Sequence, residues 1–353
     1  MLGQNIVKSS TGTVKGDKMA ESSQIMQYNC LPSSVLSRMQ ADGDGLNVLL
    51  GHLLGAFRDI GTHIRNATFS TAKVGTENSF GDNQLEVDVK CDDVIFAALR
   101  ASGTVNIASS EETPEELDCG SMLSGEGGFS VAFDPLDGSS IIDANFAVGS
   151  IVGIWPGKGL VGRRGSEQCC SMIAIFGPRV SVALAFNDFA TSAGQRFSLE
   201  LTMHQDGWVV TTPNFTVAPV AKTFAFGNLR ATADNSRYMS LLQYFIRNQY
   251  TLRYSGGLVP DIYHILVKGQ GIFTNAPSPT AKAKLRLAFE AAPIALLVEA
   301  AGGATCIYTC EVDDFIEPVS ILDAVITDIN RRVGVAYGSA MEVARFKAFL
   351  FSA

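Results

Sequence analysis

Residues 133–140, Phe-Asp-Pro-Leu-Asp-Gly-Ser-Ser, constrain this chain more than any other stretch. They place two carboxylates, Asp134 and Asp137, three residues apart at the end of an apolar run with the character of a strand. Pro135 stiffens the turn, and Gly138 with the serines after it can offer backbone N–H groups to an anion. Because hard carboxylate oxygens suit Mg²⁺ or Mn²⁺, the segment predicts a combined metal and phosphate site.

Charge and composition exclude several other kinds of chemistry. The net charge of −8 argues against nonspecific nucleic-acid binding, which rests on Lys and Arg. We therefore expect no nucleic-acid partner. No apolar run approaches the roughly 20 residues that span a bilayer, so we expect no membrane partner either. The four histidines are scattered, which disfavours a zinc site or a Ser/His/Asp triad, and seven cysteines without a zinc-like spacing fit a reducing compartment. The chemistry is therefore expected to rest on carboxylates.

The pattern along the chain predicts a tail and two halves of an α/β protein. Residues 1–29 are polar without periodic apolar positions, so we expect a flexible tail. This tail is neither Arg-rich nor clearly amphipathic, and we expect a cytoplasmic protein. The remaining chain divides into a first half over 30–215 and a second half over 216–353, which share a cleft.

Apolar periodicity predicts the elements of both halves. Helical spacing covers 34–66, and a second predicted helix runs from residue 82 or 83 to residue 100. Short apolar strands follow at 105–108, 129–133, 147–155, 171–176 and 179–186. After Pro213 strands alternate with helices, which we place at 238–247, 260–267, 284–301 and 340–350.

Further acidic residues accompany Asp134 and Asp137. Alone, each would be an ordinary surface acid, and only their combination suggests one site. They are Glu111 and Glu112 at the end of a strand-like run, Asp82 and Asp88 around a helix start, and Glu290 in a late helix.

Six segments resemble, in matching order, those of the fructose-1,6-bisphosphatase superfamily. They are 78–82, 110–112, 133–140, 227–232, 252–257 and 284–287. The likeness runs from about Cys30 to the C-terminus and is strongest to the branch that acts on sedoheptulose 1,7-bisphosphate. It implies a sugar-phosphatase fold in which helix and sheet layers alternate.

The resemblance also implies a catalytic centre with two to three Mg²⁺ ions, or Mn²⁺ in their place. The ligands it implies are Asp82, Glu111, Asp134, the Leu136 carbonyl, Asp137 and Glu290. Asp88 and Glu112 resemble the acidic pair that orients and deprotonates the attacking water. Such a centre meets the needs of phosphate-ester hydrolysis. These are an in-line hydroxide, neutralisation of the negative charge on the phosphoryl oxygens, and stabilisation of the departing alkoxide.

The substrate contacts come from the same resemblance. It implies that the 1-phosphate rests on the backbone N–H groups of Gly138, Ser139 and Ser140. It implies that the distal phosphate and the sugar contact Asn228, Tyr254, Gly256, Leu258 and Lys284. Arg253 resembles an arginine that family members extend to a neighbouring subunit, so a homodimer or homotetramer is implied. Where the fructose enzymes place a tyrosine near the sugar phosphate, this chain has Thr274-Asn275, and a smaller side chain leaves room for a seven-carbon sugar.

The expected function is the hydrolysis of sedoheptulose 1,7-bisphosphate to sedoheptulose 7-phosphate and phosphate. A fructose-1,6-bisphosphatase or a dual-substrate enzyme stays open, because one hydroxymethylene unit discriminates weakly. A noncatalytic metal- and sugar-phosphate-binding protein is a further alternative, although it would require the loss of a catalytic acid. The sequence leaves undecided the carbon number of the sugar, the physiological metal, the oligomer beyond a dimer, regulation and the role of the tail.

Overall fold

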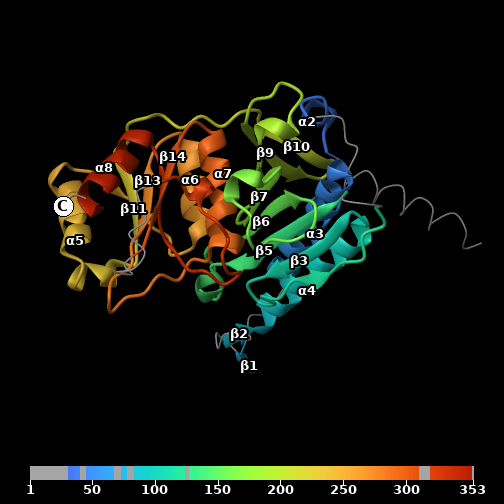
Figure 1. Cartoon of the computed structure of the whole chain (residues 1–353), viewed down its shortest axis with the longest axis horizontal. Coiled ribbons are helices and arrows are strands. Elements are labelled where there is room, and N and C mark those ends of the chain that lie inside the picture. The colour runs from blue at the N-terminus through green and yellow to red at the C-terminus, as the bar shows by residue number, and fades with distance from the viewer. Residues whose placement is uncertain are drawn as a thin grey trace, which may run out of the picture.

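Helices and sheets alternate in layers across the molecule (Figure 1). The computed structural model describes residues 31–39, 45–66, 73–77, 83–123, 127–309 and 319–351. From one end to the other, the layers are a helix pair, a large sheet, a second helix pair, a smaller sheet and a third helix pair (Figure 1). The layered α/β fold expected from the sequence is confirmed.

The large sheet has eight strands in the order β10-β9-β8-β7-β6-β5-β3-β4. They are β3 (Val105–Ser110), β4 (Leu117–Asp118), β5 (Phe129–Asp137), β6 (Val148–Pro156), β7 (Cys170–Phe176), β8 (Val180–Phe186), β9 (Phe197–His204) and β10 (Gly207–Thr212). Neighbouring strands are antiparallel, except that β3 and β5 run parallel. The apolar runs thus predict β3 and β5 to β8 correctly but miss β4, β9 and β10.

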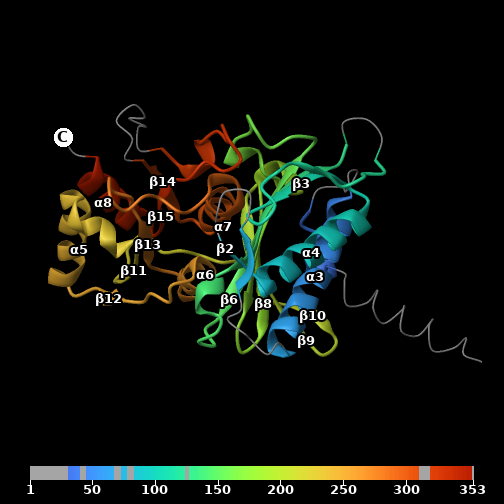
Figure 2. The same cartoon turned by 90° about the horizontal axis from the view of Figure 1, so that it is seen from below.

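One face of this sheet is covered by α3 (Leu46–Asn66) and α4 (Glu86–Ser102), as Figure 2 shows. The helical stretch predicted over 34–66 is two helices, since α2 (Ser33–Leu36) is separate from α3. Gly45, just before α3, has φ 79°, and a Cβ there would lie 2.7 Å from Cγ2 of Thr104. Glycine therefore lets the chain enter α3 against the β3 segment.

The second predicted helix begins later than residue 82 or 83. Residues Asn83–Leu85 form β2, which pairs with β1 (Lys73–Glu77) in a small antiparallel sheet, and α4 starts at Glu86. The end of α4 at Ser102 lies near the expected position.

The middle helix layer, α6 (Leu258–Lys268) and α7 (Ala292–Ala300), packs against both sheets. Residues 292–298 of α7 are all buried, because one side contacts β6 to β8 and the other β14 and β15. The helix predicted from residue 284 begins at Leu287 with a single π-helical turn, η5 (Leu287–Ala291), that leads into α7.

The smaller sheet has the order β12-β11-β13-β15-β14. Its strands are β11 (Thr223–Gly227), β12 (Thr251–Leu252), β13 (Ile272–Asn275), β14 (Ala304–Tyr308) and β15 (Gly334–Gly338). The outer layer is α5 (Ser236–Arg247) and α8 (Ala340–Leu350), near the predicted positions. Short 3-10 turns complete the connections: η1 (Ser139–Ile141), η2 (Gly165–Glu167), η3 (Asp188–Ala190), η4 (Leu229–Ala233) and η6 (Ile321–Asp323). None of the helices in the described ranges combines the length and apolar character of a membrane span.

Candidate active site

The parallel pairing of β3 and β5 brings two acids to one edge of the large sheet. In the register of this pair Ser110 lies beside Phe133, and the Glu111 backbone N–H donates to the Phe133 carbonyl at 3.1 Å. Glu111 directly follows Ser110, and Asp134 directly follows Phe133. The two acids therefore lie side by side where β3 ends. The pairing of these two strands thus explains the position of two acids of the site.

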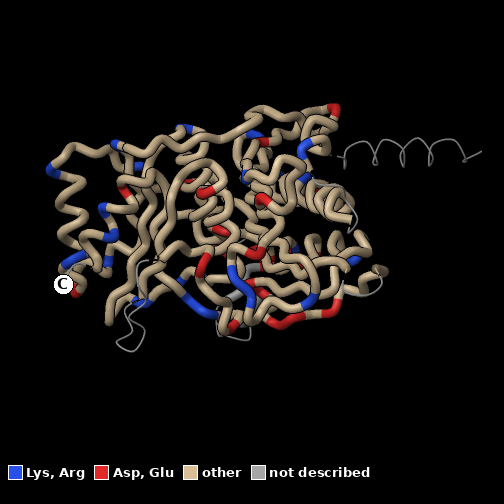
Figure 3. The backbone as a smooth tube through the Cα atoms, turned by 45° about the horizontal axis from the view of Figure 1, so that its top comes forward, with Lys and Arg blue, Asp and Glu red and all other residues tan. Residues whose placement is uncertain are grey.

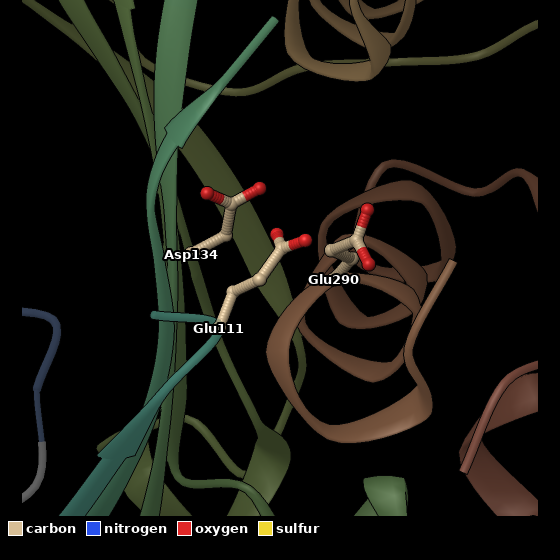
Figure 4. Close-up of side chains that lie close together, drawn as sticks. All are labelled: Glu111, Asp134 and Glu290. Atoms are coloured by element: carbon tan, nitrogen blue, oxygen red, sulfur yellow. The ribbon is translucent and has the colours of Figure 1, made fainter. Parts of the chain in front are cut away.

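The third acid, Glu290, comes from the π-helical turn η5 on the facing layer (Figure 4). Carboxylate oxygens of Glu111, Asp134 and Glu290 all lie within 4.8 Å of one another. The wide turn is closed by the N–H of Ala291, which donates to the Arg286 carbonyl at 3.0 Å. Single π turns occur preferentially at functional sites, and this one directs Glu290 toward the sheet.

Burial makes this cluster electrostatically costly without a cation. Asp134 is 4% exposed and Glu290 is 5% exposed. Burial, followed by the charge of Glu111, raises the pKa of Asp134 and of Glu290 well above the usual range. Buried carboxylates so close together must share protons or bind a cation. Three hard oxygen donors at this spacing fit Mg²⁺ or Mn²⁺.

Arg286 supplies one cation to the cluster. Its buried guanidinium makes an ion pair with the Glu111 carboxylate, and its Nε donates to Oδ1 of Asn330 at 2.7 Å. Its backbone N–H donates to Oε2 of Glu290 at 2.6 Å. The sequence motif at 284–287 contains Arg286, but its role was missed because its partner Glu111 is 175 positions away.

Asp137 lies beside the three clustered acids but has different partners. Its Oδ1 accepts from the Leu258 N–H at 3.1 Å and its Oδ2 from the Val259 N–H at 2.6 Å, at the start of α6. Burial raises the pKa of Asp137 to about 7, and the two hydrogen bonds oppose that rise. Asp137 thus ties the 133–140 turn of the large sheet to the first turn of α6 in the middle helix layer.

The acids open onto a cavity of about 480 Å³ between the two halves of the chain. Figure 3 shows acidic and basic residues close together in the middle of the molecule. Most of the expected site residues line this cavity: Glu111, Asp134, Leu136, Asp137, Gly138, Ser139, Ser140, Asn228, Tyr254, Gly256, Leu258, Lys284 and Glu290. The turn and the later half thus contribute to one space.

Three expected residues that the structure describes are not part of this lining, and a fourth cannot be placed against it. Asp82 lies outside the described residues. Asp88 is buried in the first turn of α4, and the half-buried Glu112 follows Glu111. Arg253 is exposed, and its Nη1 donates to the carbonyl of its neighbour Leu252 at 2.9 Å.

Some lining residues were not anticipated from the sequence. They are Arg230, Gly257, Phe273, Leu285, Arg286 and Arg332. Arg230 and Arg286 lie within two of the motifs that carry the resemblance. A basic side chain within a motif was therefore the sequence signal that could have identified these two residues as part of the site. Asn275, noted only as a departure from the fructose enzymes, also lines the cavity.

Comparison with known proteins agrees with this layered fold. Residues 31–203 match the model of the N-terminal domain of fructose-1,6-bisphosphatase, and residues 217–351 match that of its C-terminal domain. The chain belongs to the fructose-1,6-bisphosphatase family. As a member of this family it is a phosphatase.

Curated relatives span most of the chain. A chloroplastic sedoheptulose-1,7-bisphosphatase of Spinacia oleracea is 41% identical over 99% of this chain and 86% of its own length. The chloroplastic enzyme of the same name from Chlamydomonas reinhardtii is 45% identical over 84% of this chain and 71% of its own length.

Solved structures show the same architecture. A Toxoplasma gondii protein assigned as a sedoheptulose-1,7 bisphosphatase superposes with a TM-score of 0.79 at 35% identity, over 91% of this chain and 98% of that one. The holo form of Leishmania major fructose-1,6-bisphosphatase superposes with a TM-score of 0.77 at 26% identity, over 89% and 96% of the two chains.

Proposed function

We propose that this family member hydrolyses the 1-phosphate of sedoheptulose 1,7-bisphosphate to give sedoheptulose 7-phosphate and phosphate. The observation that carries the proposal is a single cavity that joins three clustered carboxylates to the 138–140 turn and to Lys284. Such a cavity can hold a cleavable phosphate near the acids and a second anionic group farther away. The names of the spinach and Chlamydomonas relatives support the seven-carbon substrate.

The residues for metal binding follow from the donor set. Glu111, Asp134 and Glu290 would hold the first ion, with Asp137, the Leu136 carbonyl and Asp82 available for a total of two to three Mg²⁺ or Mn²⁺ ions. When bound, such ions neutralise the phosphoryl oxygens and lower the pKa of a water molecule. Arg286, which pairs with Glu111, would keep part of the acidic charge balanced between turnovers.

The remaining chemistry belongs to the chain itself. The backbone N–H groups of Gly138, Ser139 and Ser140 hold the 1-phosphate, and Gly138 adopts φ 86° at the start of this turn. Asp88 and Glu112 do not line the cavity as the structure describes it. We assign them the role that the resemblance implies, which is to orient the water and accept its proton. The water oxygen attacks phosphorus, and the bond between phosphorus and the ester oxygen breaks. The sugar alkoxide takes up a proton from solvent, and the proton accepted from the attacking water returns to solvent, so that no net proton is gained or lost by the protein.

The sugar lies against the later half of the chain. The Asn228 amide donates to the carbonyls of Ala276 and Ala281, both at 3.0 Å, and fixes its own turn beside the cavity. Tyr254, Gly256, Leu258 and Lys284 provide the other contacts.

The choice of sugar rests on the end of β13. Of Thr274 and Asn275, only Asn275 lines the cavity, because the buried Thr274 hydroxyl bonds the Tyr238 hydroxyl at 3.0 Å. Asn275 stands where the resemblance implies a tyrosine in the fructose enzymes. The shorter side chain leaves length for one more carbon.

Residues 30–215 form the metal- and phosphate-binding half in this proposal, and residues 216–353 form the sugar-binding half. Arg253 points to a homodimer or homotetramer, because it is exposed and absent from the lining of its own cavity. Its guanidinium is free to reach the sugar phosphate in a neighbouring subunit. Light scattering of the purified full chain gives the oligomeric state directly.

The cytoplasmic location expected from residues 1–29 stays a prediction, since the spinach and Chlamydomonas relatives are chloroplastic. Expression of the full chain with a C-terminal fluorescent reporter tests it. Diffuse cytosolic signal supports the prediction, and accumulation in an organelle contradicts it.

The experiment for the substrate compares kcat/KM for sedoheptulose 1,7-bisphosphate and fructose 1,6-bisphosphate, with Mg²⁺ and with a chelator. A preference for the seven-carbon substrate that requires the metal supports the proposal. Equal values identify a dual-substrate enzyme, and a preference for the fructose substrate overturns the proposal. Release from neither substrate overturns the proposal in favour of another phosphate ester or a noncatalytic binding protein.

A further inference from the structure

The cavity has a second charged wall on the side of the smaller sheet. Four basic residues line it: Arg230, Lys284, Arg286 and Arg332. We propose that Arg230 binds the distal phosphate of the substrate, within the same subunit, and so makes the enzyme select bisphosphates. This inference rests on the proposed function and adds a residue to the contacts expected for the sugar phosphate.

The backbone of Arg230 is held firmly at the edge of the cavity. Arg230 lies in the 3-10 turn η4, directly after Asn228, which adopts a left-handed conformation with φ 48°. The Asn228 amide holds the start of this turn to the carbonyls of Ala276 and Ala281. The N–H of Ala231 closes the turn by donating to the Asn228 carbonyl at 2.9 Å.

The far end of the turn is attached to the same loop. Oδ2 of Asp234 accepts hydrogen bonds from the N–H and the hydroxyl of Thr280, at 3.0 Å and 2.7 Å. The Asn235 amide donates to the Pro277 carbonyl at 3.1 Å. With both ends attached, the Arg230 Cα has a fixed position, and only side-chain freedom is lost when a ligand binds.

Arg230 has no charged partner among the residues that the structure describes. Arg286 is paired with Glu111. Arg230 and Lys284, in contrast, make no hydrogen bond or ion pair with any residue in the described part of the chain. A guanidinium presents a planar set of donors that matches phosphate oxygens, and Lys284 adds a second positive charge in the same cavity.

The position of Arg253 strengthens the assignment. Its guanidinium donates to its own neighbour's carbonyl and lies outside the lining of its own cavity. Arg332 also lines the cavity, but it already has an interaction within the chain. Among the described guanidinium groups on the cavity wall, Arg230 is therefore the one available to the distal phosphate of its own subunit, whereas Arg253 is suited to a neighbouring subunit.

The two products of the reaction separate the two ends of the site. Sedoheptulose 7-phosphate carries only the distal phosphate, and inorganic phosphate represents the cleaved one. For Arg230→Gln we expect the KM of the bisphosphate and the inhibition constant of sedoheptulose 7-phosphate to rise together by roughly 10- to 100-fold, as expected for a charged hydrogen bond. The inhibition constant of inorganic phosphate should change less than about threefold, within the spread of uniform binding changes.

Two further variants control the experiment. Arg247→Gln removes an exposed arginine from α5 without touching the cavity and should leave all three constants unchanged. Arg230→Lys should recover part of the loss, because it keeps the charge but not the planar donors. An unchanged KM in Arg230→Gln, or equal weakening of both products, would overturn the inference.

Failure of the proposed function would be recognised separately. If the wild-type protein releases phosphate from neither bisphosphate, the proposed function fails. Calorimetric binding of sedoheptulose 7-phosphate to the wild-type protein and to Arg230→Gln then still decides the role of Arg230. Weaker binding in the variant supports the inference, and equal or undetectable binding in both overturns it.

Discussion

The two walls of the cavity are built by different means. The acidic wall is buried, and strand register and one π turn place its carboxylates, with Asp134 only 4% exposed. The basic wall is more open, because Arg230, Lys284 and Arg332 are exposed and only Arg286, the partner of Glu111, is buried. Its turns are held by side chains that bond distant carbonyls. The buried wall is suited to chemistry, because its carboxylates are held in place and electrostatic interactions are stronger at a buried site. The open wall is suited to recognition.

The largest effect should come from the acidic wall. Glu290→Gln removes a negative charge from the cluster at nearly constant volume, and we expect kcat to fall by at least about 10³-fold. Phosphate release at saturating Mg²⁺ measures this change. Asp206→Asn, an exposed acid in the β9–β10 connection, is the matched control and should keep wild-type turnover. A Glu290→Gln enzyme within about tenfold of wild type would break the distinction between the walls.

A smaller effect is expected on the recognition side. Arg253→Ala should raise KM by about 10- to 100-fold with little change in kcat, because it removes a phosphate contact present in ground and transition states. Steady-state kinetics give both constants, and Arg247→Ala controls for loss of an exposed positive charge. An unchanged KM would refute a phosphate role for Arg253.

The sugar preference should respond more modestly. Asn275→Tyr fills the end of the cavity with a longer side chain, and we expect the ratio of kcat/KM for the seven-carbon over the six-carbon substrate to fall by about tenfold. Asn275→Gln, which keeps the amide, should change the ratio less. An equal loss for both substrates would show that the position sets affinity without selecting the sugar.

The smallest effect is on stability and depends on pH. In the metal-free protein, burial raises the pKa of Asp137 to about 7, and the pKa values of Asp134 and Glu290 are also raised. Between about pH 4 and pH 7 the unfolded chain then binds fewer protons than the folded chain, so stability should fall as the pH rises.

Thermal unfolding in a chelator across this range measures the slope. Added Mg²⁺ should raise Tm most near neutral pH, because the ion binds the folded state when the acids are ionised. A Tm that rises with pH in the chelator would contradict the assignment of buried, repelling carboxylates.

Much of the fold could be predicted where one local pattern dominates. Strands β5 to β8 are continuous apolar runs, and both acids of the 133–140 turn were visible beside them. Strand β9 was missed because buried polar residues interrupt its apolar pattern. The carboxylate of its buried Glu200 accepts a hydrogen bond from the Thr212 hydroxyl at 2.7 Å. The hydroxyl of its buried Thr202 is hydrogen-bonded to the Ser181 hydroxyl at 2.9 Å.

Other features depend on partners far apart in the chain. The chain passes close to Thr104 at Gly45, just before α3, and no local pattern shows this close approach. The pairing of Arg286 with Glu111 and the attachment of η4 to 276–281 likewise join remote segments. The resemblance identified most of the residues that line the cavity. Arg230, Arg286 and Arg332 were recognised as lining residues only from the structure.

In the proposed mechanism, the three clustered carboxylates bind the metal on which turnover depends. Calorimetric titration of Mn²⁺ into the chelator-treated wild-type protein, Asp134→Asn and Asp206→Asn tests this most directly, with turnover measured on the same samples. We predict that Asp134→Asn loses Mn²⁺ affinity and turnover together, whereas Asp206→Asn keeps both. Wild-type Mn²⁺ affinity and turnover in Asp134→Asn would contradict the claim.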